Sequence, residues 1–383
     1  MTFPIQEFKK RYEKARELMK RKNLDALLIT EKSNYSYFTA HRTIGWTTKT
    51  RPIILILPLE GDPTLVIHSW EIGNAQSSCP WIKDIRTWTD LPFNIAPLLE
   101  PLRNLNLGKS KIGAELGYEQ RLNMPLDDFE KLRRELPKTQ FEDASEIFWK
   151  LRMIKSEAEI KSIRKACEIA SEAIEKTLED VRKGMTEREI GKMLYIHMME
   201  LGADRPGVAA ICAGPDSYER ESQLPTESII SPGNELFIDT GCVYNEYWSD
   251  MSRAATLGKP SEKQKEMHNL FQEATEKHIE MVRPGVKASD IVKSCLDYVR
   301  RKGLKTWGVG RMGHGIGLDF TEPPSITLND TTSLEEGMVL TIEPGTITPY
   351  GVFCTEDVIV VRKDGSEMLT TAPRELQEIR QSV

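Results

Sequence analysis

Four carboxylates and one histidine in the second half of the chain have the types and settings of metal ligands. They are Asp239, Asp250, His314, Glu343 and Glu356. Asp239 and Glu343 each end an apolar run, at residues 236–238 and 339–342. An unpaired charge buried at such a position costs on the order of several kcal/mol. A positive charge must therefore neutralise these side chains.

His314 lies in Gly313-His314-Gly315-Ile316-Gly317, and no other histidine of the chain has a glycine on both sides. Glycine lets a backbone approach a ligand closely. Four carboxylates and one imidazole suit Mn²⁺, Co²⁺, Fe²⁺ or Zn²⁺, whereas structural zinc sites are usually rich in sulfur. Two divalent ions would balance the four carboxylates, lower the pKa of a shared water and polarise a carbonyl. The residues therefore predict a two-metal site for hydrolysis.

An internal duplication supports this interpretation. Nine residues of the segment 173–202 recur in the same order within 274–303, and the sequence around the first two carboxylates recurs around the last two. Taken singly, an Asp in a D-x-G turn is usually a turn former, and a Glu before Pro-Gly is usually a solvated loop residue. Chance similarity between Glu- and Lys-rich helices could explain the helical matches alone. It does not explain why Asp239 and Asp250 in the first half align with Glu343 and Glu356 in the second. We therefore expect two related halves, each with two helices and a hairpin, that bring four carboxylates together.

The elements that must position these residues fall into two parts. At 383 residues the chain is long enough for two domains, because single cores rarely exceed about 250 to 300 residues. The first part has a helical apolar pattern followed by strand-like stretches at residues 26–30, 53–57 and 64–67, which is an α/β pattern. A long helix is expected from Ser156, which has capping-box spacing to Glu159. The domain boundary is therefore expected near residue 150.

Composition excludes several classes of function. A net charge of -6, with 52 basic and 58 acidic residues, gives no cationic field for nucleic acid or anionic lipid. No leader pattern and no run of about 18 apolar residues is present, so we expect a soluble cytoplasmic protein. The six cysteines are scattered without a C-x-x-C pair, which predicts reduced thiols rather than disulfides or a zinc–thiolate site.

The five candidate ligands and the motif G-H-G-I-G resemble the pita-bread metallopeptidase family, which includes Xaa-Pro dipeptidase (prolidase), aminopeptidase P, methionine aminopeptidase and creatinase. The resemblance covers nearly the whole chain. It implies an α/β fold, with a creatinase-like N-terminal domain at residues 1–150 and a pseudo-two-fold duplicated pita-bread catalytic domain at residues 151–383. Two domains look more like prolidase or aminopeptidase P than methionine aminopeptidase, which has one.

The resemblance also implies a role for each ligand. Asp239 would bind one metal ion with both oxygens. His314 and Glu343 would bind the other ion. Asp250 and Glu356 would bridge the pair. The catalytic residues would be His314 and Glu343, with Glu343 moving protons for a metal-bridging hydroxide that attacks an amide carbonyl.

Four candidate substrate-pocket positions depart from the family pattern. Ser222 and Thr321 stand where its peptidases place histidines, and Ser325 and Cys354 stand where arginines are common. Loss of such hydrogen-bond donors removes transition-state stabilisation unless other donors replace them. The leading hypothesis is an Xaa-Pro peptidase. The alternative is a non-peptidase on the same scaffold, a small-molecule C–N hydrolase or a lyase. A non-catalytic binding protein is least favoured, because binding alone does not require five metal ligands.

Two further features bear on what the protein contacts. Arg205 and Arg220 lie near the departing positions in sequence and are candidates for anion contacts, although most such arginines are surface charges. Family members often dimerise, which implies a homodimer. The segments 34–38 and 44–46 are candidates for that contact, although core packing is the commoner fate of such aromatic residues. The expected partners are thus a small peptide or other small molecule and a second copy of the chain.

Overall fold

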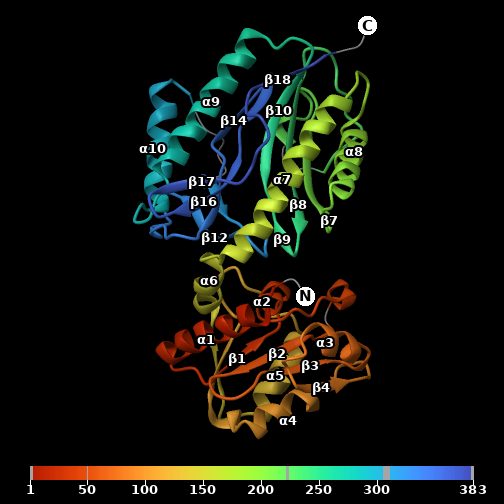
Figure 1. Ribbon diagram of the computed structural model, residues 1–383, viewed down its shortest axis with the longest axis vertical. Helices are drawn as coiled ribbons and strands as arrows, with labels where there is room; N and C mark the ends of the chain where they lie inside the picture. Colours follow the sequence, from red (N-terminus) through yellow and green to blue (C-terminus); the bar gives the residue numbers. More distant parts are fainter. Residues whose placement is uncertain (1–2, 50, 221–223, 305–310, 381–383) are drawn as a thin grey trace. The chain divides into compact units, whose positions relative to one another are not determined.

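The computed structural model describes residues 3–49, 51–220, 224–304 and 311–380. The chain divides into two compact units, Met1–Arg152 and Met153–Val383 (Figure 1). Ser222, one of the four predicted substrate-pocket residues, lies outside the described residues. The five candidate metal ligands all lie in the second unit, so its architecture is what positions the site.

The first unit is built on one six-stranded sheet with the order β4-β3-β2-β1-β5-β6. Its strands are β1 (Ala26–Ile29), β2 (Ile54–Pro58), β3 (Thr64–His68), β4 (Asp84–Trp88), β5 (Lys111–Ala114) and β6 (Gln140–Asp143). Its helices are α1 (Ile5–Lys22), α2 (Lys32–Phe38), α3 (Ile72–Ser78), α4 (Ala96–Asn104), α5 (Leu126–Glu135) and α6 (Ser145–Met153). The three predicted strand-like stretches form β1, β2 and β3, which are antiparallel neighbours in this sheet.

Helix α2 directs an aromatic segment into the core of the first unit. Tyr35, Tyr37 and Phe38 are buried, and the hydroxyl of Tyr35 lies 2.7 Å from Nδ1 of His41. The sequence made the segment 34–38 a candidate for a dimer contact. Because these three side chains are buried, they are not available for that contact. Ile44 differs, because it is 72 % exposed.

The first half of the second unit begins with the long helix that the sequence predicts. Helix α7 (Glu157–Asp180) has the predicted capping box: the N–H of Glu159 donates to Ser156 Oγ, and the N–H of Ser156 donates to Glu159 Oε2 at 2.9 Å. Together with α8 (Glu187–Glu200) it packs on a sheet with the order β18-β10-β8-β7. These strands, with β9 paired to β8, are β7 (Arg205–Cys212), β8 (Glu235–Tyr244), β9 (Tyr247–Trp248), β10 (Met251–Leu257) and β18 (Gln377–Ile379).

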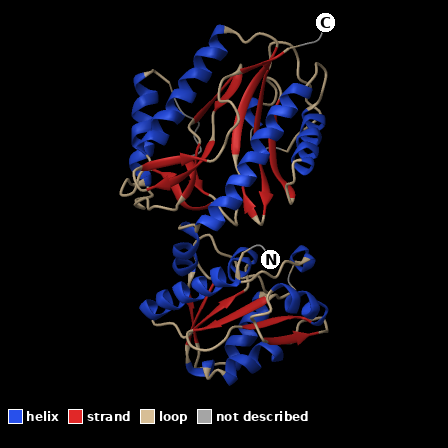
Figure 2. Cartoon of the chain, in the orientation of Figure 1, coloured by secondary structure: helices blue, strands red, loops and turns tan. Residues whose placement is uncertain are grey.

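The second half has the same order of elements. Two helices, α9 (Glu262–Met281) and α10 (Ala288–Arg301), are followed by a sheet with the order β12-β11-β13-β16-β17. Its strands are β11 (Arg311–Gly315), β12 (Glu322–Thr327), β13 (Val339–Ile342), β16 (Asp357–Arg362) and β17 (Gly365–Met368). A separate hairpin joins β14 (Gly345–Thr348) to β15 (Gly351–Cys354). Figure 2 shows helices flanking the strands of this unit, and the predicted α/β fold class is confirmed.

The antiparallel pairing in each half brings two carboxylates to one point. In the first half, Asp239 lies within β8 and Asp250 directly precedes its partner strand β10. In the second half, Glu343 directly follows β13 and Glu356 directly precedes its partner strand β16. Asp239 pairs with Ser252, two residues from Asp250, whereas Glu343 and Glu356 continue the register in which Ile342 pairs with Asp357. Diagonal and direct neighbours on antiparallel strands both lie within reach of each other, so each half holds its two carboxylates close together.

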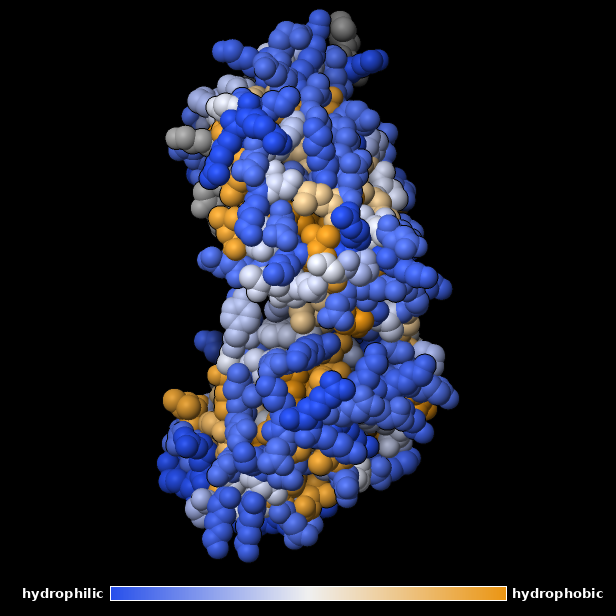
Figure 3. Space-filling view, turned by 90° about the vertical axis from the view of Figure 1, so that its left-hand side faces the viewer, coloured by the Kyte–Doolittle hydropathy of each residue, from blue (hydrophilic) through white to orange (hydrophobic). Residues whose placement is uncertain are grey.

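The surface and the thiols agree with the composition. Among the described residues, no helix is both long and apolar enough to cross a membrane. The face drawn in Figure 3 is mostly hydrophilic, with smaller hydrophobic patches. All six cysteines are buried free thiols, as their scattered positions predict.

Glu235, on β8, is a buried carboxyl that links the two halves. One oxygen accepts a hydrogen bond from the N–H of Val352 on β15, while Oε1 is buried without a hydrogen-bond partner among the described residues. Burial raises the pKa of Glu235 well above the usual 4.5, and the hydrogen bond from Val352 offsets this only partly. The folded protein therefore keeps this carboxyl protonated at pH values where the unfolded chain ionises it.

Because the pKa of Glu235 is higher in the folded protein than in the unfolded chain, the unfolding free energy depends on pH. The contribution of Glu235 to this free energy is fully present below about pH 4.5 and is lost as pH rises toward the folded pKa. Glu235→Gln, which stays neutral, should equal the parent in unfolding free energy near pH 4. It should become more stable than the parent at higher pH, by up to about 1.4 kcal/mol per pH unit. Urea unfolding from pH 4 to 8 measures this difference. The exposed Glu336→Gln is the control, and parallel pH profiles for parent and Glu235→Gln would show the prediction to be wrong.

Candidate metal centre

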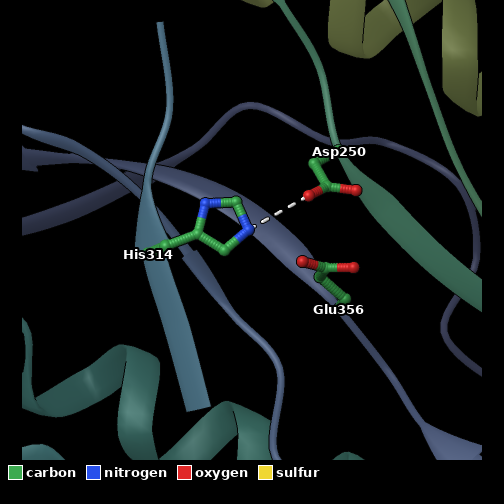
Figure 4. A group of neighbouring side chains, drawn as sticks. All are labelled: Asp250, His314 and Glu356. Atoms are coloured by element: carbon green, nitrogen blue, oxygen red, sulfur yellow. Dashed lines mark ion pairs between the residues drawn. The ribbon is translucent and has the colours of Figure 1, made fainter. Parts of the chain in front are cut away.

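Asp250, His314 and Glu356 come together in the second unit (Figure 4). One possible ligand atom of each lies within 4.8 Å of those of the other two. Nε2 of His314 is 3.3 Å from Oδ2 of Asp250, and all three side chains are buried. The two carboxylates come from different halves of the unit. The duplicated elements thus surround one buried point with candidate ligands.

Two glycines let the backbone come close enough to form this cluster. A Cβ on Gly241 would lie 1.8 Å from the carbonyl oxygen of Ser249, the residue before Asp250. Gly313, beside the histidine, has a φ of +142°, and a Cβ there would lie 2.1 Å from the carbonyl oxygen of Thr341. Any larger residue at either position would push apart strands that carry candidate ligands.

The hydrogen bond of His314 fixes which ring nitrogen faces the carboxylates. Nδ1 lies 2.9 Å from the carbonyl oxygen of Gly315, and because a carbonyl can only accept, Nδ1 carries the hydrogen. Burial lowers the pKa of the imidazole, which favours the neutral ring. Nε2 therefore presents its lone pair toward Asp250 and Glu356, the state in which histidine binds a metal.

Glu343 and Asp239 adjoin the same cluster. Oε1 of Glu343 lies 3.9 Å from Nε2 of His314. Asp239 lies close enough to act on the pKa of Asp250, and its charge contributes to raising the pKa values of Glu343 and Glu356. The structure therefore makes neighbours of all five predicted ligands.

Burial dominates the electrostatics of the carboxylates. It raises the pKa of Asp250 to about 8 and that of Glu343 to about 7, and it raises the pKa of Glu356 well above its usual value. The like charges of neighbouring carboxylates raise the pKa values of Glu343 and Glu356 further. Positive charge placed among these groups would reverse the shifts and keep them ionised.

The unsatisfied atoms at this point fit a divalent cation. Within the described residues, Asp250 Oδ1, Glu343 Oε1 and Glu356 Oε1 are buried without a hydrogen-bond donor. Buried polar atoms in folded proteins are nearly always paired, and exceptions call for an explanation. Carboxylate oxygens beside one neutral imidazole nitrogen are the ligand types that Mn²⁺, Fe²⁺, Co²⁺ and Zn²⁺ take.

Thr341 is a site residue that the sequence interpretation missed. Its Oγ1 accepts a hydrogen bond from the N–H of His314 at 3.2 Å, and its hydroxyl donates to Glu356. It therefore orients a candidate ligand from each of two strands. Its position two residues before Glu343 puts both on the same side of a strand, and this spacing could have identified it.

Arg253 holds the backbone at Glu356. The sequence interpretation also missed this residue. Its Nη1 donates to the carbonyl oxygen of Glu356 at 2.7 Å, and its Nη2 donates to Oδ1 of Asp357 at 2.7 Å. Both side chains of this ion pair are 1–2 % exposed. A buried arginine that holds the backbone at a candidate ligand is a positioning residue, and no spacing in the sequence indicates this contact.

The predicted substrate-pocket residues lie at different distances from the cluster. Cys354 ends β15 and is buried. Burial raises the pKa of its thiol, and the nearby charges of Glu356 and Glu343 raise it further. Ser325 pairs with His314 across β11 and β12. Thr321 is half-buried in the loop before β12.

Aromatic rings line one side of the histidine. The ring of Phe320 lies 5.8 Å from that of His314 and 5.3 Å from that of Trp248. The guanidinium of Arg205 lies 4.6 Å over Trp248, which places it two rings away from the histidine. Arg220 instead donates to the carbonyl oxygen of Asp216 and to Ser228.

Family profiles match both units. The profile of metallopeptidase family M24 matches residues 161–363, and that of the creatinase/prolidase N-terminal domain matches residues 11–154. The Xaa-Pro dipeptidase of Pyrococcus horikoshii is 30 % identical over 366 residues, which cover 94 % of this chain and 96 % of that protein.

Solved structures share the fold. The prolidase from Pyrococcus horikoshii OT3 superimposes with a TM-score of 0.82 at 29 % identity, over 96 % of this chain and 99 % of that one. The X-Pro aminopeptidase from Thermotoga maritima has a TM-score of 0.82 at 26 % identity, with the same coverage. Both similarities extend through both units.

Proposed function

This chain belongs to metallopeptidase family M24, and we propose that it is a metal-dependent peptidase that cleaves the amide bond before proline. The observation that carries this proposal is the buried cluster of Asp250, His314 and Glu356, in which unpaired carboxylate oxygens lie beside a neutral imidazole nitrogen. Support for the substrate class comes from relatives named Xaa-Pro dipeptidase and X-Pro aminopeptidase.

The proposed cofactor is a pair of divalent ions, with Mn²⁺ the first to test and Co²⁺, Fe²⁺ and Zn²⁺ as alternatives. Asp239, Asp250, His314, Glu343 and Glu356 would hold the ions, and the buried positions of Asp250, His314 and Glu356 support this set. Residues 151–383 would form the catalytic domain, and residues 1–150 a creatinase-like N-terminal domain.

When bound, such ions would polarise the substrate carbonyl and lower the pKa of the attacking water. The side chains supply proton transfer and orientation. The carboxylate of Glu343 would take a proton from the water and pass it to the departing amine nitrogen. Its side chain is 19 % exposed, against 2–3 % for His314 and Asp250, so it can reach a bound substrate.

A peptide panel tests the proposal. Protein loaded with Mn²⁺ should cleave Xaa-Pro dipeptides, and matched peptides with alanine in place of proline should be cleaved more slowly. Activity should disappear with a chelator and return with added Mn²⁺, because the ions would polarise the substrate carbonyl and activate the water. If the metal-loaded protein cleaves no Xaa-Pro peptide of any length, the peptidase proposal is wrong.

A second candidate is a non-peptidase hydrolase or lyase on the same scaffold. The observation in its favour is that Thr321, Ser325 and Cys354 offer no cation or imidazole beside the cluster. Metal binding without cleavage of any peptide would select this candidate. The homodimer and the cytoplasmic location stay predictions from the sequence, and light scattering tests the first of them.

A further inference from the structure

Arg311 places a positive charge at the candidate metal centre. Its Nε lies 4.0 Å from Oε1 of Glu343, and its side chain is 37 % exposed. The guanidinium also lies close enough to Asp250 to lower the pKa of that carboxyl and to lower that of Glu343. This makes Arg311 a cation that faces both the ligand cluster and solvent.

An irregularity in β11 brings Arg311 to the cluster. Residues three apart in a regular strand point to opposite faces, so Arg311 and His314 would not share a side. The pairing of β11 with β12 shifts register between these two residues, and Gly313 between them has a positive φ of +142°. Such shifts re-aim side chains and occur often beside active sites. Arg311 and His314 can therefore both approach Glu343.

The ion pair of Arg311 differs from that of Arg253, an arginine with a structural role. Arg253, in the same unit, is 2 % exposed and donates to Asp357 at 2.7 Å and to three backbone carbonyls. Arg311 makes one ion pair within the described residues, at the long distance of 4.0 Å. A guanidinium has five N–H donors in a fork that matches a carboxylate. Most donors of Arg311 are thus left for a further partner.

We propose that Arg311 binds the free carboxylate of a dipeptide substrate, which makes this enzyme a dipeptidase rather than a peptidase of longer chains. The proposal rests on the proposed function. In a dipeptide, the residue whose nitrogen forms the scissile bond also carries the terminal carboxylate, so that charge lies directly beside the metal centre. In a longer peptide that position holds a neutral amide. Arg311 would supply the cation that Ser325 and Cys354 do not.

Binding of an uncleavable ligand tests this proposal separately from catalysis. The probes are an Xaa-Pro dipeptide with a reduced scissile bond and its C-terminal amide, titrated calorimetrically into Mn²⁺-loaded protein. The acid should bind about 10- to 100-fold more tightly than the amide, because it gains charge-assisted hydrogen bonds. Arg311→Met should remove that preference, and Arg311→Lys should keep part of it. Arg301→Met, at an exposed position of α10, is the matched control and should keep all of it.

The metal content of each variant is measured, so that the preference for the acid over the amide is compared between proteins with equal amounts of bound Mn²⁺. Equal affinity of the parent protein for acid and amide, including no binding of either, would overturn the proposal. An acid preference retained in Arg311→Met would also overturn it. Cleavage of Xaa-Pro peptides is scored on its own, so an active enzyme without acid preference refutes the role of Arg311 and leaves the proposed function standing.

Discussion

Asp250→Asn is expected to yield folded protein that no longer holds divalent ions beside His314. Asparagine has the same shape but offers one neutral oxygen and an NH₂ group, which repels a cation. Because Asp250 lies 3.3 Å from Nε2 of His314 and its charge acts on both Glu343 and Glu356, its loss should affect both proposed ion positions. The kcat/KM for an Xaa-Pro dipeptide should fall by more than the roughly 10- to 100-fold cost of losing an outer partner of a metal ligand.

Metal analysis after dialysis and a steady-state assay of the same sample measure these two effects. Asp364→Asn, an exposed aspartate between β16 and β17, is the matched control and should keep parental metal content and activity. Asp250→Asn with full metal content, or with kcat/KM within a few-fold of the parent, would contradict a ligand role.

Arg253→Met is expected to produce the largest loss of stability. The variant would remove the buried guanidinium that donates to Asp357 and to the carbonyl oxygens of Glu356 and Ala372. Removing one partner of a buried ion pair costs about 3–5 kcal/mol, although replacing both partners by apolar residues is often neutral. Two other donors to Asp357, Thr370 and Arg374, reduce the charge left unpaired, which favours the lower end of that range.

Urea unfolding of metal-free protein measures this cost, because bound ions would add their own stabilisation. Arg362→Met is the control. Arg362 pairs with Glu157 and Glu367 near the surface, and such pairs contribute about 0–1 kcal/mol. A loss for Arg253→Met no larger than for Arg362→Met would mean that the buried network does not hold the structure around Glu356.

The duplication explains why the carboxylates could be predicted from the sequence. Asp239 and Glu343 end apolar runs, and Asp250 and Glu356 recur at matching places, so the neighbouring pairs follow from antiparallel pairing alone. The capping box at Ser156 and the strands of the first sheet are equally local, because short-range spacing determines them. For the same reason, the fold class needed no tertiary information.

Contacts that depend on packing between distant segments could not be predicted. Arg311 reaches Glu343 through a register shift that strand periodicity does not reveal. The carboxyl of Glu235 meets β15 far along the chain, where no motif indicates a buried acid. The aromatic segment 34–38 has the composition of an interface, but its rings fill the core of the first unit. Local sequence patterns identify candidate functional residues, but they do not predict which distant residues these contact.

We propose that four carboxylates and His314 hold a pair of divalent ions. The most direct test is to load the protein with Mn²⁺, dialyse it against metal-free buffer and count the ions retained by each chain. We expect close to two for the parent and for Asp364→Asn, and a marked loss in Asp250→Asn. A parent protein that retains no ion would contradict the claim.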